Sequence, residues 1–401
     1  MNFSSPSPSQ RPTQFWNSIL FAQGFRIFFT MAGVWSVMAM AAWLLLFQTG
    51  ISSMTLPISW LHGHEMLYGF TAAAAAGFLL TATPVWSKTP ALTGRPLQGL
   101  ALAWLLGRMG MLFSWQLPSW LPALADLTFL AGVLTFIGPT LWFTGNRVHR
   151  IFPILLGLLV LGDLLFHLEA MAWTHDTAHA GLLLGLNAIV FFLVMTGGHI
   201  MPMFTREALN AKGMNLPFGI SPALEIASAL TLTLIVLADL FFPRLQETGW
   251  IFLAAGLIQG LRLARWHGLR TLQTPLLWVL HLGYLWLVVG LLLRGLALLT
   301  GMVDASSALH ALSVGAMGLF TQGIMARISL THTGRPLLLP TVMPIAFLLL
   351  TLAALVRVFL FFWRPELTVW LAGSLWIGAF VAFCVVFLPV LLTPRPDGTP
   401  G

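Results

Sequence analysis

The chain has 401 residues, of which 58 % are hydrophobic and only 8 % are charged. A soluble domain carries about a quarter charged residues, so this composition excludes a water-soluble globular protein. The formal net charge is +7, but the basic residues stand singly in short connections, which excludes a nucleic-acid partner and leaves the lipid bilayer as the chain's surroundings.

Residues 1–20 are polar and rich in proline and serine, which predicts a disordered tail without a cleaved signal. A membrane domain is predicted over 21–394, followed by a second short tail over 395–401. Apolar runs of about 20 residues recur through this domain, and each is long enough to cross a bilayer. They predict an all-α membrane protein with twelve transmembrane helices, at 25–48, 60–83, 97–114, 120–144, 150–173, 178–201, 221–242, 248–266, 275–299, 305–330, 338–362 and 367–392.

The distribution of basic residues predicts the orientation of these helices. Lysine and arginine concentrate in the N-terminal tail and in every connection from an even-numbered to an odd-numbered helix. The opposite connections hold mainly acidic residues: Asp126, Asp176, Glu247, Asp304 and Glu366. By the positive-inside rule, both termini are predicted to be cytoplasmic.

Helices 2 and 10 share a pattern. In each, glycines follow a histidine by five and by thirteen residues, and each helix is followed by TGRP, at 93–96 and 333–336. Helix 6 also opens with a histidine, His179. The spacing favours three pseudo-repeated units of four helices, with coincidence among apolar segments as the alternative.

Six of the eleven histidines are predicted to lie in the outer third of the bilayer, on helices 2, 5, 6 and 10. They are His62, His64, His167, His175, His179 and His310. Buried imidazole is costly unless it has a partner, and neutral imidazole is a common metal ligand. We therefore predict metal ligation by His64, His310, His167, His175 and His179. For any single histidine, an interfacial role with a bond to water or a carbonyl is the alternative.

Neighbouring polar residues suit the same chemistry. Glu65 and Glu169 are candidates for orienting ligand imidazoles or for relaying protons. His62 and His64 are two residues apart, about 200° around a helix, so only one is expected to face inward, and we favour His64.

Arginines within the spans, Arg327 among them, suit the carboxylates of a haem, with salt bridges or snorkelling as the alternative. The sequence lacks CxxCH, so any haem is expected to be held without thioether bonds, as haem b.

Five stretches carry a resemblance to a known family: GFRIFF (24–29), HGHEM with the run after it (62–82), FHLEAMAW (166–173), MPMFTREAL (201–209) and the segment 310–336 that ends in TGRP. Together they resemble the NnrS family over most of the chain. The resemblance implies a bacterial inner-membrane protein that contains haem and copper and is tied to nitric oxide metabolism and nitrosative stress. It also implies importance for His62, His64, Glu65, His167, Glu169 and His310.

The predicted architecture is also similar to the catalytic subunit of haem–copper oxidases and nitric oxide reductases, in which helices 2 and 10 hold haem. This chain lacks the paired histidines of helix 7, and helix 10 has one histidine rather than two. The similarity therefore supports the architecture and only part of the site. A copper or other second metal would need ligands such as His167, His175 or His179.

The leading hypothesis is a haem-containing membrane protein that binds nitric oxide and removes it by reduction, with electrons from a donor that the sequence does not identify. We assign haem to His62, His64, His310 and Arg327, and catalytic roles to Glu65 and Glu169. The alternatives are a transporter for copper or a small anion, or a non-catalytic protein that binds nitric oxide.

Overall fold

The computed structural model describes residues 19–50, 57–144, 146–218, 221–243 and 245–398, and this part of the chain contains helices and no strands. Most of the predicted N-terminal tail lies outside the described residues. The first six crossings are α2 (Gly24–Thr49), α3 with η2 and α4 (Ile58–His64, Glu65–Thr71 and Ala72–Ser87), α5 (Arg95–Leu112), α6 (Trp120–Phe143), η3 with α7 (Arg147–Arg150 and Ile151–Ala170) and α8 (Thr177–Asn210). The next three are α9 (Pro222–Phe241), α10 (Gly249–Ala264) preceded by the short η4 (Gln246–Thr248), and α11 (Pro275–Thr300) preceded by the short η5 (Gly268–Thr271). The last three are α12 with η6 and α13 (Ala305–His310, Ala311–Gly318 and Leu319–His332), α14 with η7 (Val342–Leu355 and Val356–Leu360) and α15 (Pro365–Leu392).

All twelve predicted helices are present in the described chain. Ten of these helical stretches are long and apolar enough to cross a membrane. The other two predicted crossings correspond to α5, which carries Arg95 and Arg108, and α10, which has only 16 residues. In a bilayer, helices satisfy every backbone hydrogen bond within one segment, which explains why apolar runs of this length fold this way.

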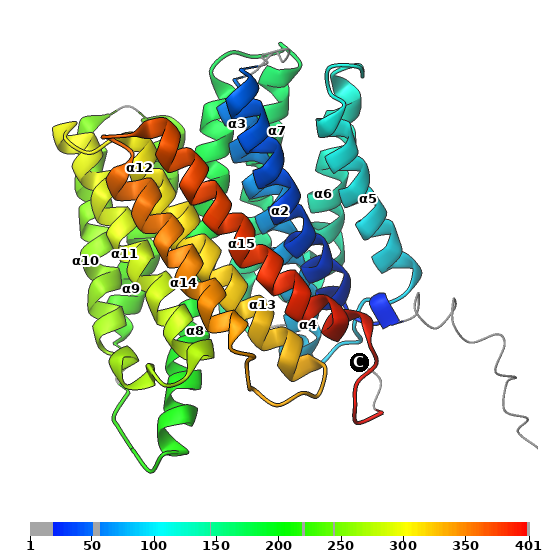
Figure 1. Cartoon of the computed structure of the whole chain (residues 1–401), viewed down its shortest axis with the longest axis vertical. Helices are drawn as coiled ribbons and strands as arrows, with labels where there is room; N and C mark the ends of the chain where they lie inside the picture. Colours follow the sequence, from blue (N-terminus) through cyan, green and yellow to red (C-terminus); the bar gives the residue numbers. More distant parts are fainter. Residues whose placement is uncertain (1–18, 51–56, 145, 219–220, 244, 399–401) are drawn as a thin grey trace, which may run out of the picture.

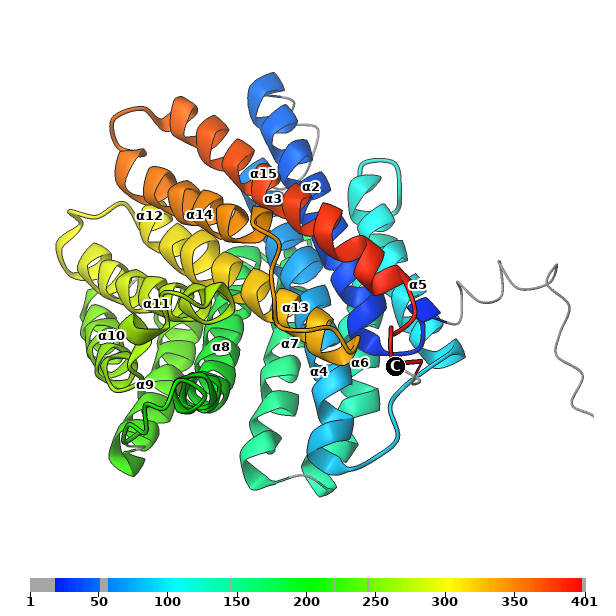
Figure 2. The same ribbon diagram turned by 60° about the horizontal axis from the view of Figure 1, so that its bottom comes forward.

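The helices form a bundle with two distinct ends (Figure 1). The segments α3 and α12 begin, and α7 ends, at what we call the histidine end of the bundle. The C-terminal part of α15 lies at the opposite end, where α2 begins. α15 packs along α2, so the last crossing lies beside the first (Figure 2).

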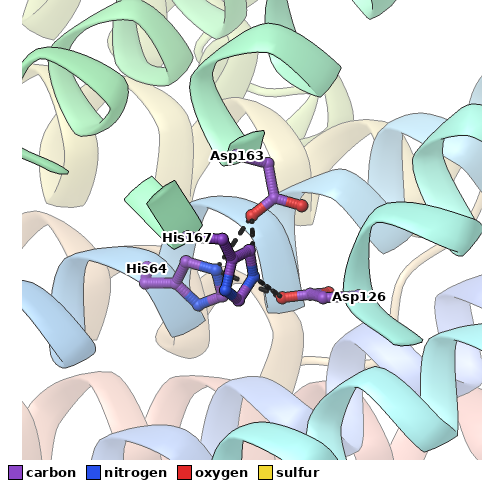
Figure 3. Close-up of side chains that lie close together, drawn as sticks. All are labelled: His64, Asp126, Asp163 and His167. Atoms are coloured by element: carbon purple, nitrogen blue, oxygen red, sulfur yellow. Dashed lines mark hydrogen bonds and ion pairs between the residues drawn. The ribbon is translucent and has the colours of Figure 1, made fainter. Parts of the chain in front are cut away.

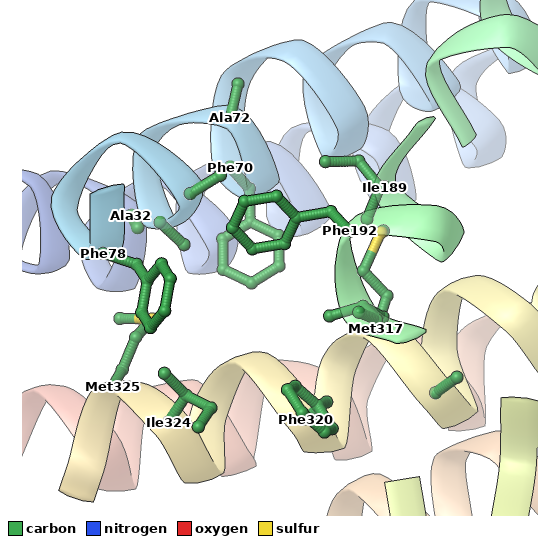
Figure 4. Close-up of a cluster of buried hydrophobic side chains, with 14 of the residues drawn as sticks. Ala32, Phe70, Ala72, Phe78, Ile189, Phe192, Met317, Phe320, Ile324 and Met325 are labelled. Atoms are coloured by element: carbon green, nitrogen blue, oxygen red, sulfur yellow. The ribbon is translucent and has the colours of Figure 1, made fainter. Parts of the chain in front are cut away.

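Helices 2, 6 and 10 form the centre of the bundle. In the most apolar windows of these three crossings, 94, 83 and 78 % of the residues are buried, whereas most of the outer spans reach at most 50 %. Phe70, Phe192 and Phe320 come from these three crossings and lie in one buried hydrophobic cluster (Figure 4). The central position is what three four-helix units would require, but the repeat itself stays a prediction.

Candidate functional site

The backbone changes its helical type directly after two of the predicted histidines. After His64 the chain is π-helical over Glu65–Thr71, and after His310 it is π-helical over Ala311–Gly318. A third π-helical segment, Val356–Leu360, carries Arg357. π-Helical turns are rare and occur frequently at functional sites, so their positions mark the histidine end as the candidate site.

Four side chains from three helices meet at this end. His64 comes from α3, Asp126 from α6, and Asp163 and His167 from successive turns of α7 (Figure 3). His64 Nε2 lies 3.0 Å from Asp163 Oδ1 and 3.1 Å from Asp126 Oδ2. His167 Nε2 lies 3.4 Å from Asp126 Oδ2 and 3.5 Å from Asp163 Oδ1. These four residues, which we call the His/Asp cluster, are at most 2 % exposed and could hold a metal ion.

Glu65 and Arg108 hold one side of the His/Asp cluster in place. Arg108 Nη1 donates to both carboxylate oxygens of Glu65, at 2.7 Å each, and Arg108 Nη2 donates to Asp126 Oδ1. Glu65 also lies 3.1 Å from His64 Nδ1 and accepts a hydrogen bond from Trp35 Nε1 at 3.0 Å. If Nδ1 donates to Glu65, Nε2 of His64 is left to face the two aspartates.

A separate cavity of about 430 Å³ opens at the same end of the bundle. Its volume lies in the range of small-molecule and cofactor sites. His62, His310 and Arg357 line it together with His179 and apolar side chains that include Met40, Trp43, Trp60, Met66, Met317 and Trp376. The rings of His62 and His310 are nearly parallel, with centroids 6.5 Å apart and planes 11° apart.

The polar atoms of the cavity differ in how they are satisfied. His310 Nδ1 lies 2.7 Å from the carbonyl oxygen of Ser306, so Nδ1 carries the proton and Nε2 is left as a lone pair. Arg357 Nη2 donates to Ser306 Oγ at 2.7 Å. In the described chain, the buried atoms Arg357 Nη1 and His62 Nδ1 have no hydrogen-bond partner. Arg357 Nη1 can only donate, so it suits a ligand that carries an acceptor group, whereas His62 Nδ1 can donate or accept according to its tautomer.

His62 and His64 correct the expectation that only one of the pair faces into the protein. His62 lines the cavity, stacked on Trp43 at 4.6 Å, while His64 lies in the His/Asp cluster. Both side chains point into the protein because this crossing, Ile58–Ser87, is surrounded by other helices on nearly all sides.

The remaining predicted residues are spread over other places. Glu169 Oε2 accepts a hydrogen bond from the backbone N–H of Ala178 at 2.7 Å, in the first turn of α8. His175 is exposed, and His179 lies at the cavity beside Trp60, with ring centroids 6.2 Å apart. Arg327 stacks over Phe204 at 3.6 Å, roughly 25 Å along the helix from His310. The structure therefore brings His64 together with His167, and His310 together with His62.

The sequence interpretation missed two members of the cluster. Asp126 stands above among the acidic residues of the outer connections, although it falls within the predicted helix 120–144, and in α6 it is buried against Arg108. Asp163 is not among the residues that the sequence analysis singles out. Its signal was available, because Asp163 stands inside an apolar run four residues before His167 and thus on the same helix face.

The fold and these two sites define a polytopic helical membrane protein with buried candidate metal ligands at one end of its bundle. The model of the family described as NnrS protein matches residues 19–395. The chain therefore belongs to the NnrS family, as the sequence motifs predicted. A search of curated proteins found no match.

Proposed function

We propose that the chain binds haem in the cavity at the histidine end and uses it to bind and remove nitric oxide. One observation carries the proposal: two nearly parallel imidazoles, His62 and His310, line one largely apolar cavity beside the unpaired Nη1 of Arg357. Imidazole suits haem iron, and guanidinium suits the carboxylates of the haem propionates. The residues present therefore fit the group that the family resemblance implies.

His310 is the better candidate for the iron ligand. A ligating histidine usually donates its second ring N–H to a carbonyl or a carboxylate, which fixes the ring and the tautomer. His310 has such an acceptor in the Ser306 carbonyl, whereas His62 Nδ1 has no hydrogen-bond partner in the described chain. We assign His62 to the opposite wall, where its imidazole can give a proton to a bound ligand or take one from it.

Bound haem would supply an iron able to bind nitric oxide. Arg357 would hold a propionate, and the tryptophans and methionines of the lining would exclude water. Removal by reduction converts two nitric oxide molecules, two protons and two electrons into nitrous oxide and water. The electrons must come from an external donor. On the predicted topology this chemistry lies near the periplasmic face of a bacterial inner membrane.

The test is an absorption spectrum of the full chain purified in detergent. We expect a Soret band that shifts when nitric oxide is added to the reduced protein. His310→Ala should lower the Soret absorbance per protein by about tenfold or more. His281→Ala is the matched control, because His281 is also buried but bonds to Thr205, outside the cavity.

Three outcomes would count against parts of this proposal. A protein without a Soret band contradicts haem binding and favours the transporter alternative. A haem spectrum that is indifferent to nitric oxide contradicts gas binding and leaves electron transfer. Nitric oxide that binds but is not consumed when electrons are supplied contradicts reduction and favours a non-catalytic binding protein.

A further inference from the structure

The His/Asp cluster is a second site, which faces away from the cavity. Its ligand atoms are His64 Nε2, His167 Nε2, Asp126 Oδ2 and Asp163 Oδ1, and they lie 3.0 to 3.5 Å apart across the four His–Asp pairs. Four atoms bound tetrahedrally to one ion at about 2.0 Å lie about 3.3 Å from one another. The four His–Asp distances match this spacing, and all the ligand atoms lie within 4.8 Å of one another, which suits one four-coordinate ion.

The charge of the cluster calls for a cation. Glu65, Asp126 and Asp163 are three carboxylates, and Arg108 is the single guanidinium bonded to them. With neutral imidazoles, the formal charge of the group is −2, and in a buried environment such a charge is costly unless it is balanced. One divalent ion restores neutrality.

The hydrogen-bond pattern also favours a bound cation. When His64 Nδ1 donates to Glu65, the lone pair of Nε2 faces carboxylate oxygens, which are acceptors themselves. Two acceptors at 3.0 Å repel unless a proton or a metal ion lies between them. In addition, Asp163 is 0 % exposed, and its Oδ2 has no hydrogen-bond partner in the described chain. A cation bound at Oδ1 would balance the charge of this carboxylate.

We propose that His64, His167, Asp126 and Asp163 bind one divalent transition-metal ion in a closed structural site that fastens α3, α6 and α7 together. Imidazole and carboxylate donors suit Zn²⁺, Fe²⁺ or Mn²⁺, whereas Cu⁺ prefers thiolate and thioether ligands, which the cluster lacks. Four protein ligands leave no open position, so this ion holds the helices and does not bind the gas. The site is independent of haem in the cavity.

Metal content tests the proposal directly. The full chain, purified in detergent, is analysed by inductively coupled plasma mass spectrometry, with haem iron from a pyridine haemochrome assay subtracted. We expect about one divalent ion per chain, and retention of that ion by His310→Ala even if haem is lost. Asp163→Asn should lower the ion content by about tenfold.

Asp239→Asn is the matched control for removal of a buried acid. Asp239 is 4 % exposed and interacts with Asn187 and Arg294, and it is not part of the His/Asp cluster. This variant should keep the ion. His167→Gln provides a second test if Asp163→Asn does not fold.

Cobalt substitution tests the coordination. Protein grown with Co²⁺ should show the intense visible bands of tetrahedral Co²⁺, and these bands should not change when nitric oxide is added. Wild-type protein without a bound ion would overturn the proposal and leave two protonated imidazoles as the balancing charges. An ion that survives in both Asp163→Asn and His167→Gln would overturn the ligand assignment. Cobalt bands that shift with nitric oxide would overturn the closed coordination.

Discussion

His62 and His64 belong to the same short helix, yet they take part in two different sites. His62 lies 6.5 Å, centroid to centroid, from the ring of His310, and His64 Nε2 lies 3.0 Å from Asp163. The two residues are about 200° apart around the helix, so His62 points into the cavity on one side and His64 points into the His/Asp cluster on the other. This arrangement makes the two sites separable by mutation.

The orientation of the bundle is the first prediction. If the termini are cytoplasmic, a reporter that is active only in the periplasm should be silent when fused after Pro394. The same reporter inserted beside Asp304, between α11 and α12, should be active, because that loop lies at the histidine end. Activity at the first position and silence at the second would place both candidate sites near the cytoplasm.

Arg357 should anchor the carboxylate of the ligand in the cavity. A hydrogen bond to a charged group contributes about 1.5–3 kcal/mol, so Arg357→Gln should weaken haem binding by roughly 10- to 100-fold. Titration of haem into the apoprotein measures this change. Arg294→Gln is the control, because Arg294 is a buried arginine paired with Asp239 rather than a cavity residue. Equal losses in the two variants would show that the effect is on the fold.

Glu169 is expected to contribute to the stability of the fold rather than to nitric oxide consumption. Its carboxylate accepts the backbone N–H of Ala178 at the start of α8, and loss of such a cap typically costs about 1 kcal/mol. Glu169→Ala, which removes the acceptor, should therefore lower the thermal stability slightly and leave nitric oxide consumption near the native rate. A large loss of consumption with intact haem would return Glu169 to the catalytic role that the sequence suggested.

Gly69 should tolerate no side chain. A Cβ at this position would lie 2.6 Å from Trp35 Nε1 and 2.9 Å from Arg108 Nη1, the two groups that hold Glu65. Gly69→Ala is expected to destabilise the fold by about 1–3 kcal/mol through this overlap. Gly99→Ala is the control, because its Cβ would meet no atom within 4 Å. Thermal melts in detergent compare the two variants, and equal melting temperatures would contradict the predicted overlap.

The sequence by itself determined the number of helices and the end of the bundle where the candidate site lies. Each crossing needs about 20 apolar residues, and short connections alternate their direction, so the axial depth of His62, His167 and His310 could be worked out by counting. The TGRP and histidine motifs were sufficient to indicate the family.

Only the tertiary structure decided which residues share a site, because that depends on how each helix is rotated about its axis. In a soluble helix, a polar face reveals the rotation, but lipid and protein interior are both apolar, so these membrane helices carry little such signal. Counting therefore placed His64 and His310 at similar depth without showing that His64 faces Asp126 and Asp163 while His310 faces His62. Asp126 became a site residue only when α5, α6 and α7 packed together and brought Arg108 and His167 to its carboxylate.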